Sequence, residues 1–179
     1  TFSEAPPLGT TNIEVVVIET LALGESSASL TNYLPAGTGA VQTTVQEKLR
    51  ETVSVKDFGA VGDGVTDDTA AIRLALVAAF AASPTQKSVY FPAGNYLISD
   101  GLDRTGTGNY VDIYGAGQRN TIITVDAGAT PFNAAFFMAE PTDIVGRTTV
   151  RDMTIDCNSV ASYGLDARSM RSWTLQNVE

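Results

Sequence analysis

The segment that most constrains the fold is a glycine- and aspartate-rich stretch, VSVKDFGAVGDGVTDDT at residues 53–69, which leads directly into an apolar run. Asp67 or Asp68 can accept hydrogen bonds from the first free N–H groups of a helix, where the helix dipole also favours negative charge. Glycines favour tight turns because they adopt backbone angles that a side chain resists, and here they are Gly59, Gly62 and Gly64. The stretch therefore predicts a junction at which a new domain begins.

The helix expected after this junction, at about residues 69–82, has one wide apolar side. Apolar residues recur there with spacings of i, i+3, i+4, i+7 and i+8, at Ile72, Ala75, Leu76, Ala79 and Phe80. Ser83-Pro84 ends the pattern. We expect this helix to cover the open end of a sheet structure and to protect its strand edges from pairing with other chains.

From residue 88 onward the sequence consists of short β-rich runs separated by turns. The runs are VYF, YLI, YVDIYG, TIITV, TTVRDMTID and SWTLQNVE, with turns expected at Gly115 to Gly117 and at residues 158–162. The string from Val150 resembles the string from Leu175, and 175 − 150 gives an offset of 25 residues that also separates Val125 from Val150.

An offset of this size is typical of a solenoid. If the chain forms one, side chains alternate along each strand. We therefore expect Met153 and Ile155 to point inward and Thr154 and Asp156 to point outward.

The part before the junction predicts three short pieces. Residues 1–11 are expected to be extended, residues 12–23 to form a strand, and residues 24–39 to form a loop. Val41, Val45 and Leu49 recur every four residues and predict a short helix with a narrow apolar stripe. That stripe can pack on a neighbouring domain of the chain or on two further copies around a symmetry axis.

Two strings carry a resemblance to a known family. SVKDFGAVGDGVTDDTAAI and SVYFPAGNYLI resemble the opening of the pectate-lyase-like, right-handed, single-stranded parallel β-helix found in phage tailspikes, polysaccharide depolymerases and some pectinases. The upstream run YLPAGTGAVQTTVQEKLRETVSVKDFGA is similar to the tailspike form in particular, and FSEAPPLGTTNIEVVV resembles the last strands of a virion-binding module.

The resemblance implies a mainly β fold and three parts. Residues 1–31 would end a virion-binding module, residues 32–53 would form a neck with a short helix, and residues 54–179 would form the helix-capped first coils of an incomplete β-helix. It further implies a homotrimer in the virion, outside the host cell, that joins a phage tail or baseplate protein and adsorbs to bacterial surface polysaccharide. The parent protein would be a polysaccharide hydrolase or lyase. A free-standing lyase or hydrolase and a non-enzymatic receptor-binding fibre remain alternatives.

Composition limits the other functions. Twenty acidic against 11 basic residues, a net charge of −9, disfavour nucleic-acid and membrane-surface binding, which need clustered cations. The longest apolar run is residues 74–82, far short of the ~20 residues that span a bilayer. Histidine is absent and Cys157 is the single cysteine, expected to be a buried thiol.

Two binding motifs are ruled out by their spacing. The glycines of FGAVGDG and YGAGQRN match neither phosphate-binding pattern, so no cofactor is expected. The cluster of Asp63, Asp67 and Asp68 fails the EF-hand pattern because Val65 and Leu74 stand at ligand positions. Capping and turn formation are therefore expected there, and no metal.

No catalytic residue is assigned. The candidate surface acids are Asp126, Asp152, Asp156 and Asp166. In an extended strand Asp152 and Asp156 would be about 13 Å apart, too far for glycoside hydrolysis. Tyr163 and Trp173 could form a platform for a sugar ring, or they could pack in the core or between subunits. The arginines at positions 147, 151, 168 and 171 have no diagnostic spacing. The resemblance places a polysaccharide site on later coils or between subunits, so it assigns no role to a residue here.

Overall fold

The computed structural model describes residues 27–80, 88–103, 110–137, 145–166 and 170–179. The strand expected at residues 12–23 lies outside these residues. The chain divides into two units, Thr1–Gln46 and Glu47–Glu179.

The described part of the first unit is a small hairpin followed by a helical turn. β1 (Asn32–Tyr33) pairs antiparallel with β2 (Thr43–Thr44), and α1 (Val45–Leu49) follows. The loop expected at residues 24–39 is therefore interrupted by a strand. The helix expected from Val41 begins only at Val45, because the two β-branched threonines before it pair as a strand.

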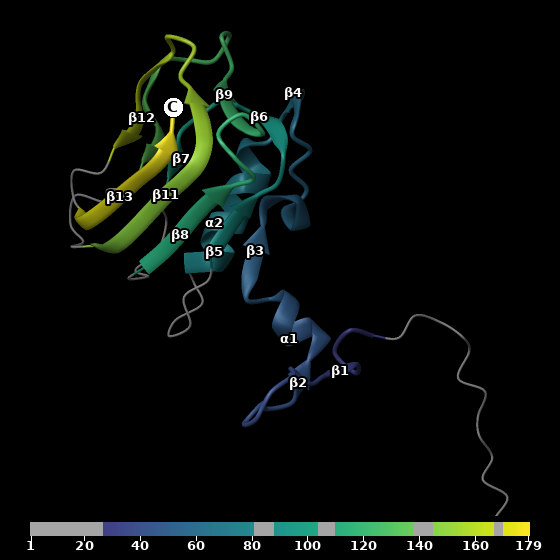
Figure 1. The fold of residues 1–179 in the computed structure, drawn as a ribbon. Helices are drawn as coiled ribbons and strands as arrows, with labels where there is room; N and C mark the ends of the chain where they lie inside the picture. The colour runs from purple at the N-terminus through teal and green to yellow at the C-terminus, as the bar shows by residue number, and fades with distance from the viewer. Residues whose placement is uncertain (1–26, 81–87, 104–109, 138–144, 167–169) are drawn as a thin grey trace, which may run out of the picture. The chain divides into compact units, whose positions relative to one another are not determined.

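The second unit is a parallel β-helix with three faces, each made of parallel strands that stack from coil to coil (Figure 1). The first face consists of β3 (Thr52–Ser54), β5 (Ser88–Phe91), β8 (Tyr110–Gly115), the N-terminal part of β11 (Val145–Asp156) and β13 (Met170–Val178). The second consists of β4 (Asp63–Asp67), β6 (Gly94–Ile98), β9 (Thr121–Val125) and the end of β11. The third consists of β7 (Leu102–Asp103), β10 (Phe132–Phe137) and β12 (Ala161–Asp166).

The strand register tests the expected repeat. Val150 pairs with Leu175, so the 25-residue offset is confirmed there. The expected repeat from Val125 to Val150 is wrong, because Val125 pairs with Ile98 on the second face whereas Val150 pairs with Ile113 on the first face. Met153 is buried, Ile155 packs against the core and Asp156 is exposed, as expected.

The core of the solenoid contains aromatic rings from all three faces. Phe91 on β5 meets Tyr96 on β6 and Phe136 on β10 edge to face, with ring centroids 5.6 and 6.2 Å apart. All three side chains are fully buried. Edge-to-face pairs of this kind add to the free energy of apolar burial, so the three faces are joined through one continuous core.

The amphipathic helix is found as α2 (Thr69–Phe80). Its buried apolar residues are the predicted ones, Ile72, Ala75, Leu76, Ala79 and Phe80. They belong to the same buried cluster as the ring residues, and α2 contacts β3, β5, β7 and β8. The expected end at Ser83-Pro84 lies outside the described residues.

The aspartate-rich junction combines turns with a strand. The short 3₁₀ helix η1 (Val55–Phe58) ends at Gly59, and Gly59, Gly62 and Gly64 have φ of +97°, +72° and +77°, as their positions predict. Residues 63–67 were expected as turn but form β4, which pairs irregularly with β6. In the part of the chain that the structure describes, no helix is long and apolar enough to cross a membrane.

Candidate functional site

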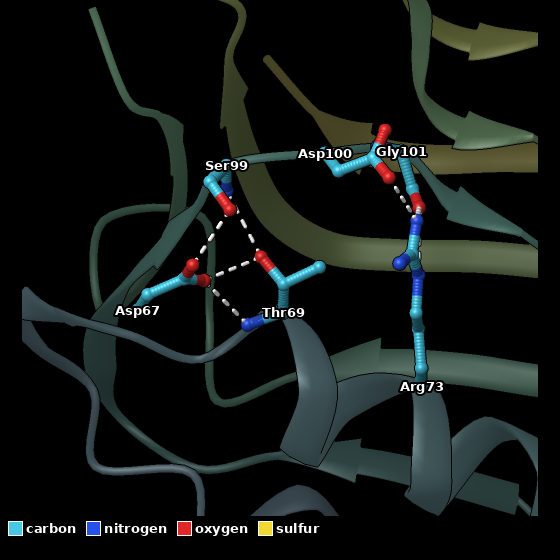
Figure 2. A network of polar contacts seen from close by, with 6 residues as sticks. All are labelled: Asp67, Thr69, Arg73, Ser99, Asp100 and Gly101. Atoms are coloured by element: carbon cyan, nitrogen blue, oxygen red, sulfur yellow. Dashed lines mark hydrogen bonds and ion pairs between the residues drawn. The ribbon is translucent and has the colours of Figure 1, made fainter. Parts of the chain in front are cut away.

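The carboxylate of Asp67 joins the start of α2 to the second coil (Figure 2). It accepts hydrogen bonds from Thr69 N at 2.9 Å, from the Thr69 hydroxyl and from Ser99 Oγ at 2.6 Å. Ser99 N in turn donates to Thr69 Oγ1 at 2.9 Å. Burial would raise the pKa of Asp67, but the hydrogen bonds from Ser99 and Thr69 outweigh it and hold the pKa below 3.8. Asp67 is therefore the helix-capping carboxylate.

Asp68, the other predicted cap, has a different role. Its side chain is buried and accepts from Val61 N at 2.7 Å and from Gly62 N at 3.0 Å, while its backbone carbonyl accepts from Ile72 N at 2.9 Å. Asp68 thus holds the glycine loop against the helix. Burial, followed by the charge of Asp68, raises the pKa of Tyr96 to about 12.

Asp63 closes its own turn. Its Oδ1 accepts from Val65 N at 2.9 Å and from Thr66 N at 2.7 Å, and its Oδ2 accepts from the Thr66 hydroxyl at 2.9 Å. Both oxygens are occupied by donors of the chain itself. Among the described residues, no group of three or more acidic, cysteine or histidine side chains could hold a metal ion.

Arg73 makes a second set of contacts between α2 and the residues that follow β6 (Figure 2). Its guanidinium donates to the carbonyl of Gly101 and forms an ion pair with Asp100, with Nη2 2.8 Å from Oδ2. The hydrogen bond from Arg73 lowers the pKa of Asp100 below 3.8. The carboxylates of Asp63, Asp67, Asp68 and Asp100 are therefore all engaged in contacts that hold the junction together.

The outer side of the first face carries a group of aromatic and charged side chains that contact one another. Tyr90, Tyr114 and Arg151 occupy paired positions on β5, β8 and β11. The Tyr90 and Tyr114 ring centroids are 5.0 Å apart, and the Arg151 guanidinium carbon lies 4.5 Å from the Tyr114 ring centroid. The three side chains form one stacked column, which we call the outer column, and all are partly exposed.

Arg151 also bridges two carboxylates. It forms a bidentate pair with Asp112 at 2.9 and 3.3 Å and binds Asp152 Oδ2 through Nη1 at 2.9 Å. The pKa of Arg151 is raised chiefly by its hydrogen bonds to Asp112. Bidentate geometry fixes the guanidinium plane, so the arginine is held rigidly over the tyrosine ring.

Asp112 and Asp152 do not form a hydrolytic pair. Glycoside hydrolysis needs two carboxyl groups that flank the bond, one of them an acid with a raised pKa. Here a guanidinium lies between the two groups, and the hydrogen bond from Asn177, followed by that from Arg151, lowers the pKa of Asp152. This geometry is suited to binding and not to acid catalysis.

Two of the other predicted acids form turns, and the third is buried. Asp126 Oδ1 accepts from Gly128 N and Asp156 Oδ1 accepts from Asn158 N, both at 2.9 Å and both in turns. Asp166 is buried and accepts from Asn133 Nδ2 at 3.1 Å. Asp126 and Asp156 are therefore turn-forming residues, whereas the expectation that Asp166 lies on the surface is wrong, because its side chain is buried.

The predicted sugar platform is wrong. Tyr163 is exposed on β12 of the third face, where it pairs with Ala134, whereas Trp173 lies on β13 of the first face. Residues on different faces do not form one platform. The side chains of Trp173, Arg147, Arg168 and Arg171 lie outside the described residues. Cys157 is half-buried, and this burial raises the pKa of its thiol.

Residues 52–179 match the family described as rhamnogalacturonase A/epimerase, pectate lyase-like. A mannuronan C5-epimerase of Azotobacter vinelandii is 38% identical over 109 residues, which cover 59% of this chain and 8% of the epimerase. The tail spike protein of Shigella phage Sf6 is 28% identical over 152 residues, which cover 78% of this chain and 23% of the spike. The chain thus spans less than a quarter of either relative.

Among solved structures, the ORF18 protein of Geobacillus virus E2 is similar to this chain with a TM-score of 0.54 and 25% identity. The similarity covers 85% of this chain and 31% of the viral protein.

Proposed function

Because the chain belongs to the pectate-lyase-like family of rhamnogalacturonases and epimerases, we propose that it is part of a phage tailspike that binds and degrades a bacterial surface polysaccharide. In this proposal residues 1–31 end the virion-attachment module and join a tail or baseplate protein. Residues 32–53 form the neck, and residues 54–179 begin the β-helix of the polysaccharide-directed part. The whole protein acts in the virion, outside the host cell.

One observation carries this proposal. Residues 52–179 make up 128 of the 179 residues, so a match to 85% of the chain cannot fit within them. The similarity to the viral protein therefore extends into the residues upstream of the β-helix. The match to the epimerase covers only 59% of the chain. Similarity to a viral protein upstream of the β-helix favours a spike over a free-standing enzyme.

We further propose that the neck assembles three copies. Its large apolar side chains are exposed within the single chain, with 65% exposure for Leu34, 78% for Val41 and 69% for Leu49. Apolar side chains that are exposed together mark interaction sites. Three identical necks around an axis would bury them without a second kind of protein.

Mass in solution tests the assembly. Light scattering on the whole 18.8 kDa chain should give three times the monomer mass, and Leu34→Asp should reduce it to the monomer. Leu74→Asp, at an exposed position on α2, is the matched control and should leave the trimer intact. A monomeric wild-type chain would contradict the trimer and favour the free-standing enzyme.

Tail attachment and chemistry need separate tests. Gold-labelled antibodies against this chain should mark the tails of the phage particles that encode it, and unlabelled tails would contradict the proposed location. The longer natural protein should release reducing ends or unsaturated sugars from capsule or lipopolysaccharide. Tail labelling without such release would identify a non-enzymatic receptor-binding fibre.

A further inference from the structure

We propose that the outer column binds an uncharged saccharide chain that lies along the solenoid across β5, β8, β11 and β13. This inference rests on the proposed function, which supplies polysaccharide as the target. It adds where in this chain the polysaccharide is held and which chemical class it belongs to.

The outer side of the first face has the composition of a sugar-binding surface. Val53, Val89, Ile113 and Val150 are buried at successive register positions, so their neighbours along each strand point outward. Most of the described residues at these outward positions are uncharged and polar: Thr52, Ser54, Ser88, Tyr90, Tyr114, Thr149, Thr174 and Gln176. The charged residues among them are Asp112 and Arg151. Hydroxyl and amide groups of this kind can both donate to and accept from sugar hydroxyls.

The two tyrosines present hydroxyl groups that no described residue occupies. Within the described ranges, neither the Tyr90 nor the Tyr114 hydroxyl has a hydrogen-bond partner. Tyr90 and Arg151 lie on either side of the Tyr114 ring. A saccharide would therefore contact the ring edge and the phenol hydroxyl of Tyr114. Stacking and the bidentate pair with Asp112 hold these groups in place before binding, which lowers the entropic cost of binding.

Charge selects the class of saccharide. Among the outward-facing side chains of the first face that the structure describes, Arg151 is the one cation, and Asp112 and Asp152 both pair with it. The cluster therefore has one negative charge in excess. At this cluster a uronate chain would meet repulsion, and the described side chains of the face offer it no unpaired cation, whereas an uncharged chain would lose no electrostatic free energy.

The row of paired positions that contains the outer column and continues to Gln176 is long enough for several sugar rings. From Tyr90 through Tyr114 and Arg151 to Gln176 there are three strand steps, about 14 Å at ~4.8 Å per step. The paired positions lie in one row along the stack. An extended oligosaccharide can thus contact successive strands, which a single sugar cannot.

A glycan array tests the proposal with the whole chain. It would carry oligosaccharides of neutral hexoses and deoxyhexoses beside oligosaccharides of mannuronate and galacturonate. We expect binding to at least one neutral glycan. Tyr114→Ala should weaken that binding at least tenfold, and Tyr114→Phe, which keeps the stacked ring but removes the hydroxyl, should weaken it about fivefold.

Tyr163→Ala is the matched control, because Tyr163 is an exposed tyrosine on the third face. It should bind like the wild type, and the thermal unfolding midpoint of each variant should show that it is folded. Binding to uronates alone, binding to no glycan, or binding that Tyr114→Ala leaves unchanged would each overturn the inference. If any of these results appears while the phage tails are labelled by antibody and the longer protein releases sugars from capsule or lipopolysaccharide, the outer column is not the site but the proposed function stands.

Discussion

Asn177 Nδ2 donates a hydrogen bond of 2.9 Å to Asp152 Oδ1 on the preceding coil. The two residues occupy the corner at which the first face bends into the second, with φ of +51° and +59°. Asparagine and aspartate tolerate this left-handed conformation better than other residues with a side chain. The corners of these two coils are therefore matched to each other by both backbone and side chain.

Replacement of Asn177 separates these two contributions. Asn177→Ala loses the hydrogen bond and places a poorly tolerated side chain at positive φ, so we expect the free energy of unfolding to fall by about 1–2 kcal/mol. Asn177→Gly loses only the hydrogen bond and should cost less. Urea unfolding of both variants measures the difference, and equal losses would contradict the role of the backbone conformation.

Asp68→Ala should destabilise the junction strongly. The buried carboxylate satisfies the N–H groups of Val61 and Gly62, and its removal leaves both donors without a partner, at a cost of about 2–4 kcal/mol. Asp57→Ala, at an exposed position in the same segment, is the control. If both variants unfolded at the same urea concentration, the structural role of Asp68 would be disproved.

Gly115 is required by close packing between coils. A Cβ atom at this position would lie 2.3 Å from the carbonyl oxygen of Asp152 and 2.8 Å from Thr121 Cβ. Gly115→Ala should therefore cost about 1–3 kcal/mol of stability, as overpacking does in other cores. At Gly128 the added Cβ would meet the carboxylate oxygens of Asp126 at ordinary contact distances of 3.6 and 3.9 Å, so Gly128→Ala should leave the thermal midpoint within a degree or two of the wild type. A similar loss in both variants would argue against the close approach.

The sequence predicted the elements with strong local signals. The stripe of α2 and the capping aspartate at its start were placed correctly, whereas residues 63–67, expected as turn, form β4. The third face was missed. β7 is two residues long, and β12, ASYGLD, has a glycine and alternates poorly. Such strands form because the adjacent coil offers a partner, which a local pattern does not contain.

The outer column was missed for a related reason. Val89 pairs with Ile113 and Ile113 pairs with Val150, so successive coils differ in length by 13 residues, since 37 − 24 = 13. A search for one fixed period cannot place Arg151 over Tyr114. The available signal was the likeness of VYF at Val89 to IYG at Ile113, which would have aligned the two tyrosines but not the arginine.

Acid should loosen the attachment of α2. The pKa values of Asp67 and Asp100 lie below 3.8 in the folded chain. As the pH falls, the unfolded chain takes up protons first, so the stabilisation is complete well above pH 3.8 and is lost as the pH falls through 3.8 towards the folded pKa values. Unfolding free energies measured in urea should be flat above about pH 5 and decline below about pH 4. The double variant Asp67→Asn and Asp100→Asn should show a shallower decline, and an unchanged slope would contradict this assignment.

Two leucines on α2 test whether the helix is held by its apolar stripe. Leu76 is fully buried against the solenoid, whereas Leu74, two residues earlier, is 57% exposed. Leu76→Ala removes buried methyl groups and leaves a cavity, so the free energy of unfolding should fall by about 2–5 kcal/mol. Leu74→Ala makes the same chemical change in the same helix and should change it by less than about 0.5 kcal/mol. Because helix propensity changes equally in both variants, the difference between them isolates the packing of α2 against the coils. Equal effects in urea unfolding would mean that α2 does not cover the core.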